Sequence, residues 1–362
     1  LTIPVLPQGE SAAVEEAARM LVEAEFPVLV ADRAARTPAG MALLVELAET
    51  LQAAVIDRGS RLNFPTRHPL NQTHRYSNGP PPMNRPIISG ADVILGLEVM
   101  DFWSTVNTLR DQLHRSVTRV ARPDAKLISI TTSDLYIRSN YQDFRRMQEV
   151  DLAIAADAEV TLPSLIEAVN RLTTGARRRV FAERGRRLAE ASRISDENAR
   201  IAASYAWDAS PVSTARLCAE IWAQIKDEDW SLVSSYYSDG GGWPRQLWDF
   251  DKSYQWLGHA GGGGIGYGAP ASVGGALANR RHGRFSVAIQ TDGDLMYAPG
   301  ALWTAAHHRI PLLSVMHNNR AYHMEAMHVQ RMCNARNRGI DRAQIGSELV
   351  DPNINYAKMA ES

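Results

Sequence analysis

The stretch FSVAIQTDGDLMYAPGALWTAAHHRIPLLSVMHNN, residues 285–319, decides the fold of the second half of the chain. FSVAIQ (285–290) is an apolar run of strand length, and PLLSVMHNN (311–319) contains the next strand together with the residues at its end. A helix is expected between the two strands, over about 298–308. Strands that alternate with helices predict a parallel sheet. A right-handed crossover then brings the carboxyl ends of the two strands to the same edge of that sheet.

A polar residue follows each of these strands, Asp292 after the first and Asn319 after the second. Because parallel strands end at one edge, we expect the two side chains to be neighbours. A carboxylate and an amide oxygen suit Mg²⁺, which often takes further oxygens from phosphate. Gly293 leaves room for a phosphate, and the next helix offers free N–H groups. The alternative is that Asp-Gly and Asn-Asn are ordinary turns.

The rest of the chain repeats this alternation and predicts an α/β protein made of two doubly wound parallel-sheet domains. Further strands are expected at 27–31, 53–57, 91–98, 126–131, 152–156 and 230–236. Helices are expected at 11–24 (capped by Ser11), 39–52, 103–114, 162–172, 211–226 and 270–279. The arginine-rich segment 175–205 is interpreted as a solvated linker helix rather than an anion-binding arm.

Composition limits the classes of partner. The chain has 362 residues and a net charge of −1, so we expect no nucleic acid or membrane surface as partner. It contains no apolar run long enough for a transmembrane helix. Two cysteines, Cys218 and Cys333, are too few for a disulfide framework, and we expect a cytoplasmic location. The first residues, LTIPVLPQGES, read like an interdomain linker, so we expect a fragment of a longer protein.

A glycine run, GHAGGGGIGYGAP, occupies residues 258–270. Gly261, Gly263 and Gly266 match G-x-G-x-x-G, but a dinucleotide-binding fingerprint should directly follow a strand, and YQWLGHA is not a convincing one. We interpret the run instead as a segment whose backbone, lacking side chains, a flat cofactor could approach closely.

These motifs together resemble the thiamine-diphosphate-dependent 2-oxo acid enzymes, a family that includes acetolactate synthase and benzoylformate decarboxylase. TDGD and HNN resemble the two halves of the family signature, and GALWTAAHHRIP looks especially like benzoylformate decarboxylase. GGGGIGYGAPASVGGALA and VDLAIAADAEVTLPSLIEAV resemble further family segments. The resemblance implies a central Rossmann-like domain over 1–174, a helical linker over 175–210 and a diphosphate-binding fold over 211–362, which we expect to be incomplete at its C-terminus.

The resemblance also implies residue roles. Mg²⁺ would be held by the side chains of Asp292 and Asn319 and by the carbonyl of Ala321. Ile265 would support the thiazolium ring of the cofactor in its bent form, and the backbone of Gly264 or Gly266 would face the aminopyrimidine. The remaining residues implied to lie next to thiamine diphosphate are Gly293, Asp294, Asn319, Ala321 and Tyr322.

Two residues depart from the family pattern, Thr291 in place of a glycine and Asp294 in place of a small residue. A β-branched residue restricts the backbone at 291, and a carboxylate beside a diphosphate is unfavourable unless it turns away. The pyrimidine-binding domain, which in the family carries the glutamate that activates the cofactor, is expected upstream of this chain. The catalytic residues themselves are therefore unknown, although His259, His307, His308, His317 and His323 are candidates for proton transfer.

Three functions remain open. The first is an acetolactate-synthase-like lyase or ligase acting on small 2-oxo acids, and the second is a non-oxidative decarboxylase of the benzoylformate type. The third is a catalytically impaired paralogue that only binds the cofactor. The family resemblance further implies a homodimer or homotetramer, and FAD or an adenine nucleotide in the central domain stays undecided.

Overall fold

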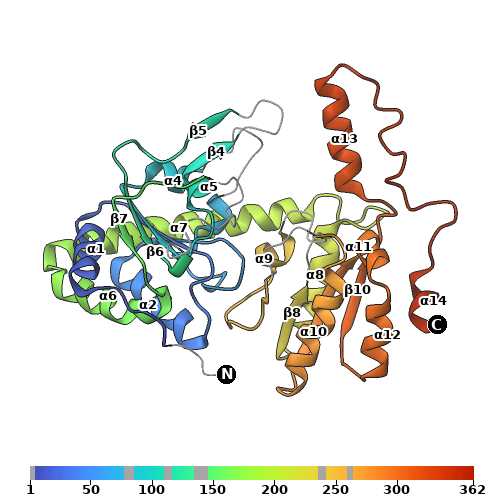
Figure 1. The fold of residues 1–362 in the computed structure, drawn as a ribbon, viewed down its shortest axis with the longest axis horizontal. Coiled ribbons are helices and arrows are strands. Elements are labelled where there is room, and N and C mark those ends of the chain that lie inside the picture. Colours follow the sequence, from blue (N-terminus) through green and yellow to red (C-terminus); the bar gives the residue numbers. More distant parts are fainter. Residues whose placement is uncertain (1–4, 77–84, 110–115, 134–145, 235–241, 259–263) are drawn as a thin grey trace. The chain divides into compact units, whose positions relative to one another are not determined.

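The computed structural model describes residues 5–76, 85–109, 116–133, 146–234, 242–258 and 264–362. Contacts divide the chain into two compact units. The first consists of Leu1–Ala209 and Arg245–Ser253, and the second of Ser210–Pro244 and Tyr254–Ser362. Each unit is built on its own parallel sheet with helices beside it (Figure 1).

The first unit contains a five-stranded parallel sheet in the order β2-β1-β3-β6-β7. The strands are β1 (Pro27–Ala31), β2 (Ala54–Asp57), β3 (Val93–Leu97), β6 (Lys126–Ile130) and β7 (Leu152–Ile154). The chain passes from β1 outward to β2 and then returns past β1 to β3, so the sheet is wound in both directions. All the strands expected in this half are present.

Helices α1 (Ser11–Glu23), α2 (Pro38–Leu51) and α6 (Ala158–Leu172) pack side by side and bury their apolar stripes in the core of the first unit. The short helices α3 (Thr73–Tyr76) and α4 (Pro86–Gly90) follow β2. The prediction that Ser11 caps α1 is wrong, because Ser11 is already helical. Glu10 is the cap, and its carboxylate accepts a hydrogen bond from the Ala13 N–H at 3.0 Å.

The helix expected over 103–114 is much shorter in the structure. Helix α5 (Phe102–Val106) gives way to β4 (Asn107–Leu109), which pairs antiparallel with β5 (Val117–Arg119). Thr105 and Val106 are β-branched and favour extended backbone. The side-chain amide of Asn107 also donates to the carbonyl of Trp103 at 2.9 Å, which closes the end of the helix.

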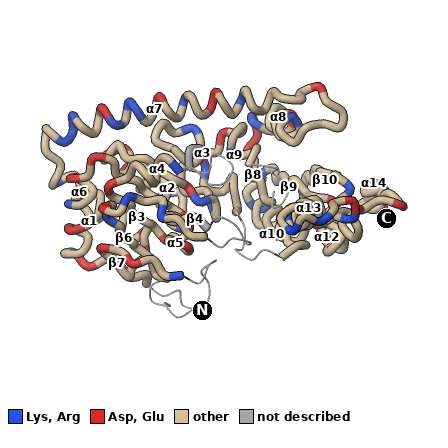
Figure 2. The backbone as a smooth tube through the Cα atoms, turned by 90° about the horizontal axis from the view of Figure 1, so that it is seen from above, with Lys and Arg blue, Asp and Glu red and all other residues tan. Residues whose placement is uncertain are grey.

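Helix α7 (Gly175–Ser204) carries alternating basic and acidic residues along its length (Figure 2). It is a helix, as expected, but it packs on the first unit instead of lying free in solvent. Arg184 is only 1% exposed and donates to the carbonyls of Gln52 and Glu25 at 2.9 Å, to that of Ala24 at 3.2 Å, and to that of Leu51. These bonds attach the middle of α7 to the ends of α1 and α2.

Residues 245–253 belong to the first unit although the residues on either side belong to the second. Thr66 and Phe250 exchange hydrogen bonds, since the Thr66 N–H donates to the Phe250 carbonyl at 2.9 Å and the Phe250 N–H to the Thr66 hydroxyl at 3.0 Å. Trp248 and Phe250 are fully buried and stacked, with ring centroids 6.0 Å apart. No pattern in the sequence indicated that residues 245–253 pack with the first unit.

The second unit contains a three-stranded parallel sheet in the order β10-β9-β8. Its strands are β8 (Trp230–Ser234), β9 (Phe285–Thr291) and β10 (Leu313–His317). Its helices before and between the strands are α8 (Thr214–Ile225), α10 (Gly268–Arg280), α11 (Asp292–Tyr297) and α12 (Gly300–His307). The short helix α9 (Trp243–Leu247) crosses the boundary between the two units. Helix α8 lies on one side of these strands, and α10 and α12 lie on the other (Figure 2).

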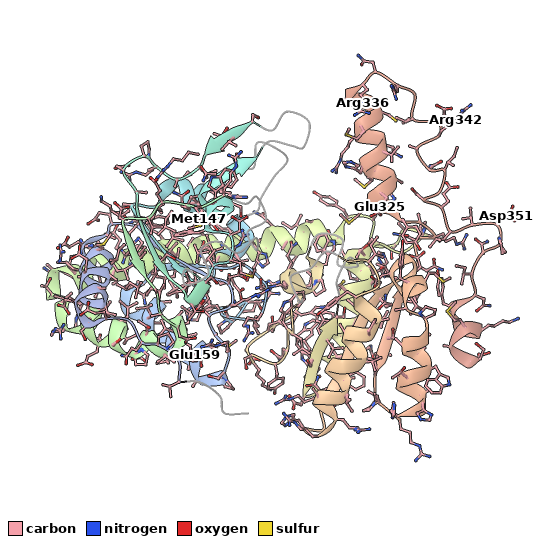
Figure 3. All side chains as sticks on the ribbon, viewed as in Figure 1. Met147, Glu159, Glu325, Arg336, Arg342 and Asp351 are labelled. Atoms are coloured by element: carbon pink, nitrogen blue, oxygen red, sulfur yellow. The ribbon has the colours of Figure 1, made fainter. Side chains whose placement is uncertain are left out.

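Three features of the second unit differ from expectation. Residues 292–297 lie before the helix expected over about 298–308 and form a separate helix, α11. After β10 come two helices that no periodicity predicted, α13 (His323–Ala335) and α14 (Tyr356–Glu361). Helix α13 stands away from the sheet, with Arg336 and Arg342 at its far end and in the segment beyond it (Figures 1 and 3). None of the described helices is long and apolar enough to cross a membrane.

Candidate cofactor and cation site

The ends of β9 and β10 lie side by side, as the βαβ pattern predicted. Thr291 is paired with His317 in the sheet, so the chain leaves both strands at the same level. The backbone N–H of Arg320 then donates to Asp292 Oδ2 at 2.6 Å. The loop that follows β10 is therefore tied directly to the carboxylate that follows β9.

The loop after β10 is a tight turn held by its own asparagines. Asn318 Oδ1 accepts from the Arg320 N–H at 3.1 Å, and Asn319 Oδ1 accepts from the Ala321 N–H at 3.0 Å. Arg320 has a φ of +57°, in the left-handed region that non-glycine residues rarely adopt. An amide oxygen has two lone pairs, so Asn319 Oδ1 still has one available for a cation.

Ala321 lies in a short antiparallel bridge whose backbone hydrogen bonds do not involve its carbonyl. Ala321 pairs with Glu348, and the hydrogen bonds lie on both sides of this pair. The Tyr322 N–H donates to the Ser347 carbonyl, and the Leu349 N–H to the Arg320 carbonyl, each at 2.7 Å. In such a non-hydrogen-bonded pair, the central residues do not bond to each other. The bridge therefore fixes Ala321 without using its oxygen.

Asp292 has the properties expected of a cation ligand. Its side chain is fully buried, and within the described part of the chain Oδ1 has no hydrogen-bond partner. A buried carboxylate oxygen without a partner is costly unless a positive charge meets it. No three His, Cys, Asp or Glu side chains among the described residues gather to hold a metal alone. One carboxylate with amide and carbonyl oxygens suits Mg²⁺ that receives further oxygens from a phosphate.

Two more polar atoms near Asp292 are buried without a hydrogen-bond partner among the described residues, His317 Nδ1 and the hydroxyl of Tyr356. Burial lowers the pKa of His317, although the charge of Asp292 opposes that shift. Burial, followed by the charges of Asp292 and Tyr322, raises the pKa of Tyr356 to about 12. Tyr356 comes from α14, and no sequence pattern pointed to it.

Gly293 and Tyr322 fit against each other. A Cβ added at Gly293 would lie 2.6 Å from Cε1 of Tyr322, so the glycine makes room for this ring. The ring of Tyr322 also meets that of Tyr297 edge to face, with centroids 5.9 Å apart. That a phosphate approaches Gly293 stays a prediction.

The described end of the glycine run includes Gly264, Ile265 and Gly266, whereas Gly261, Gly263 and His259 lie outside the described residues. The side chain of Ile265 is 36% exposed. Gly266 has a φ of +94°, and a Cβ there would lie 2.7 Å from Cβ of Tyr297. The positive φ and the close approach of Tyr297 together explain why the segment needs glycine at 266.

Both departures from the family signature have a local explanation. Thr291 has a φ of −80° and a ψ of 147°, which is ordinary extended backbone for a β-branched residue. Asp294 is buried, and its carboxylate accepts from the N–H groups of Gly266 and Gly268 and from the side chain of Gln290. The structure thus gives the Asp294 carboxylate partners within the protein.

Of the candidate histidines that the structure describes, only His317 has a buried ring nitrogen without a hydrogen-bond partner near Asp292. His307 stacks on Trp303 at the end of α12, and His308 follows it. Because α12 runs back along the sheet before β10 begins, its end lies at the edge opposite Asp292. His323 is exposed at the start of α13.

In the first unit, the start of α2 after β1 is the place where a doubly wound sheet would bind a nucleotide phosphate. Here it holds a carboxylate of the protein, because Glu159 accepts from the Arg36 N–H at 2.6 Å and the Thr37 hydroxyl at 2.5 Å (Figure 3). Asn63 Oδ1 also accepts from the N–H groups of Ala34 and Ala35.

Two family models match the chain. The model described as the C-terminal TPP-binding domain of thiamine pyrophosphate enzymes matches residues 239–362, and the model of their central domain matches residues 14–165. Together the two matches cover more than half of the chain. The chain belongs to the thiamine pyrophosphate enzymes. Thiamine pyrophosphate is another name for thiamine diphosphate, so the family resemblance is confirmed.

Sequence relatives from two branches of the family are similar to parts of this chain. A Mycobacterium tuberculosis protein assigned as acetolactate synthase large subunit IlvX is 34% identical over 103 residues, which is 28% of this chain and 19% of that protein. Benzoylformate decarboxylase from Pseudomonas aeruginosa is 42% identical over 60 residues, or 17% of this chain and 11% of that enzyme.

Solved structures confirm the doubly wound α/β fold. Benzoylformate decarboxylase from Polynucleobacter necessarius covers 100% of this chain with a TM-score of 0.70 and 15% identity. The thiamine diphosphate-dependent 4-hydroxybenzoylformate decarboxylase of Rhodococcus jostii RHA1 covers 100% with a TM-score of 0.66 and 21% identity. At these identities the likeness shows the fold alone. This chain spans 60% and 59% of those two chains.

Proposed function

We propose that this chain binds the diphosphate end of thiamine diphosphate through Mg²⁺, as part of an enzyme that breaks or forms C–C bonds in 2-oxo acids. The observation that carries the proposal is the buried Asp292 Oδ1, which has no hydrogen-bond partner among the described residues. Asn319 Oδ1 and the carbonyl of Ala321 would complete the protein's share of the cation ligands.

The protein's own groups would bind and orient the cofactor. The Arg320 N–H holds Asp292 Oδ2, which leaves Oδ1 for the cation. Gly293 would lie against the diphosphate, and Ile265, between Gly264 and Gly266, would lie under the thiazolium ring. When bound, thiamine diphosphate supplies the carbanion and the electron sink for decarboxylation.

For the overall reaction, we propose an acetolactate-synthase-like conversion of small 2-oxo acids. The match to the protein assigned as an acetolactate synthase large subunit supports this choice, because it extends over 103 residues. The activating glutamate would come from a pyrimidine-binding domain outside this chain. A homodimer or homotetramer and a cytoplasmic location are part of the same proposal.

A non-oxidative decarboxylase of the benzoylformate type is the second candidate. It is supported by the 42% identity over 60 residues to benzoylformate decarboxylase. Product analysis with the full-length protein distinguishes the two. Acetolactate from pyruvate supports the first, whereas benzaldehyde from benzoylformate without any acetolactate supports the second.

Calorimetry with thiamine diphosphate and Mg²⁺ tests the binding site itself. Asp292→Asn keeps an oxygen for the Arg320 N–H but removes the charge that faces the cation. Losing one partner of a buried charge pair costs about 2–5 kcal/mol, so we expect affinity to fall at least about 30-fold.

Asp341→Asn is the matched control, because the Asp341 side chain is 79% exposed in the same unit and should leave affinity unchanged. If the full-length protein with native Asp292 binds no thiamine diphosphate, both enzyme proposals fail. A protein that binds the cofactor but converts no 2-oxo acid would instead be the catalytically impaired paralogue.

A further inference from the structure

Both oxygens of the Asp294 carboxylate accept hydrogen bonds from the protein. Oδ1 accepts from the Gly266 N–H at 2.6 Å, and Oδ2 accepts from the Gly268 N–H at 3.0 Å and from Gln290 Nε2 at 2.8 Å. The side chain is buried on the first turn of α11. It therefore connects that turn to a segment 26 to 28 residues earlier in the chain.

The glycines and the aspartate fit together. Gly268 is the first residue of α10, so its N–H has no acceptor within the helix, and a carboxylate is the favoured partner there. A Cβ at Gly268 would collide with Asp294 Oδ2, and one at Gly266 would collide with Tyr297, the last residue of α11. Hydrogen bonds to a charged acceptor are about twice as strong as neutral ones.

Ile265 directly precedes the first of these anchored amides. Its side chain is β-branched and therefore stiff, so the position of its backbone decides where the side chain points. Asp292, the proposed cation ligand, stands on the same turn of α11 as Asp294. One helical turn thus holds the cation ligand and, through Asp294, the backbone that carries Ile265.

We propose that Asp294 is a positioning residue that fixes Ile265 relative to Asp292. This inference rests on the proposed function, in which Ile265 supports the cofactor ring and Asp292 binds the cation. In this role the carboxylate of Asp294 bonds to the protein and not to the cofactor or the substrate. It acts by holding the Gly266 and Gly268 amides.

Asp294→Asn in the full-length protein tests the inference, first without cofactor. The substitution keeps the shape of the side chain but points an NH₂ group at an N–H donor. Loss of one hydrogen bond costs about 1–1.5 kcal/mol, which corresponds to roughly tenfold faster exchange. We therefore expect hydrogen–deuterium exchange of a peptide covering 264–270 to speed up about tenfold, with no change in Asp341→Asn.

The second readout separates positioning from binding. Misplacement of a group by about 1 Å can cost roughly 100-fold in rate, so we expect kcat to fall by about that factor in Asp294→Asn. The affinity for thiamine diphosphate and Mg²⁺ should change by no more than about threefold, because the Asp292 ligands are untouched. Ile265→Ala should lower kcat similarly without faster exchange at 264–270. If Asp294→Asn does not fold, Asp294→Ser, which keeps one acceptor, replaces it.

If hydrogen–deuterium exchange at 264–270 is unchanged in Asp294→Asn, Asp294 does not hold this segment and the proposal is wrong. Faster exchange with an unchanged kcat would overturn the positioning role. A failure of the proposed function is recognised separately, because the full-length protein with native Asp294 would then bind no cofactor. The hydrogen–deuterium exchange experiment would still show whether Asp294 holds the glycine segment.

Discussion

Tyr356 brings a hydroxyl to Asp292 from the far end of the chain. The hydroxyl is buried and lacks a hydrogen-bond partner among the described residues, which disfavours the folded state when nothing is bound. A tyrosine hydroxyl is protonated at neutral pH, and the raised pKa of Tyr356 extends that state to higher pH, so it can donate a hydrogen bond. A diphosphate oxygen or a cation-bound water beside Asp292 would be a suitable acceptor.

Tyr356→Phe should therefore have opposite effects on binding and on stability. We expect affinity for thiamine diphosphate with Mg²⁺ to fall about three- to tenfold, the value of one hydrogen bond of about 1 kcal/mol. The unfolding temperature of the cofactor-free protein should stay the same or rise, because an unpartnered buried hydroxyl is removed. Calorimetry and thermal unfolding measure the two effects, and equal affinities would exclude Tyr356 from the site.

At the scale of residues, the sequence predicted that Asp292 and Asn319 lie at the ends of neighbouring strands. It did not predict the residues that approach them from other parts of the chain. Asp292 and Asn319 follow from strand order, because parallel strands end at one edge. The position of Tyr356 and the hydrogen bonds of Asp294 to the glycine segment depend on how distant segments pack. Local hydrophobic periodicity does not predict such packing. The predicted roles of Ile265, Gly264 and Tyr322 stay predictions.

Helix α2 begins at the point where a doubly wound sheet usually receives a nucleotide phosphate. Glu159 and Asn63 already accept the N–H groups there, and the negative charge of Glu159 would repel a phosphate. Gly40 makes room for this carboxylate, since a Cβ there would collide with it.

We therefore expect the purified full-length protein to carry no FAD or adenine nucleotide at this place. Absorbance in the flavin bands and chromatography of the heat-released supernatant check this expectation. Stoichiometric flavin or adenine nucleotide in the protein would show that the arrangement around Glu159 opens on binding, and the prediction would be wrong.

Arg184 is one of the residues that attach helix α7 to the first unit, together with Arg177. Arg184→Met keeps most of the apolar stem but leaves the carbonyls of Gln52, Glu25 and Leu51 without this donor. Each unsatisfied buried carbonyl costs about 1–3 kcal/mol, so we expect a loss of roughly 3 kcal/mol or more in the free energy of unfolding. Urea unfolding measures it, with the exposed Arg186→Met on the same helix as control. Equal midpoints for the two variants would contradict the prediction.

At the scale of elements, apolar runs predicted the strands of both sheets, including β10, whose residues are exposed or half-buried. Helix α13 was missed because its sequence, HMEAMHVQRMCNA, has no clear apolar stripe, and only Ala326 on it is buried. Hairpin β4–β5 was missed because Trp103, Val106, Leu109 and Leu113 recur at the spacing of an amphipathic helix.

The acid stability of the whole molecule should depend on His74. Burial, and then the charges of Arg245 and Arg67, lower the pKa of His74 from 6.5 to about 4. The unfolded chain binds a proton below about pH 6.5 that the folded chain binds only near pH 4, so stability is lost as the pH falls through that window. A shift of this size corresponds to at most about 3 kcal/mol.

His74→Gln should flatten this dependence between pH 6.5 and 4, whereas His328→Gln, an exposed histidine of the second unit, should not. Denaturant midpoints measured at several pH values provide the comparison. If the His74→Gln protein loses stability over this pH range as steeply as the unmodified protein, another group is responsible.

The nine residues 245–253 have a consequence for how this gene could evolve or be divided. A cut at residue 210 would look natural on the sequence, yet the first fragment would lack Trp248 and Phe250 and leave an apolar slot open to water. The second fragment would carry those same side chains with nothing to cover them. The two units are therefore not interchangeable modules, and a recombination event that replaced one of them would have to replace this insert as well.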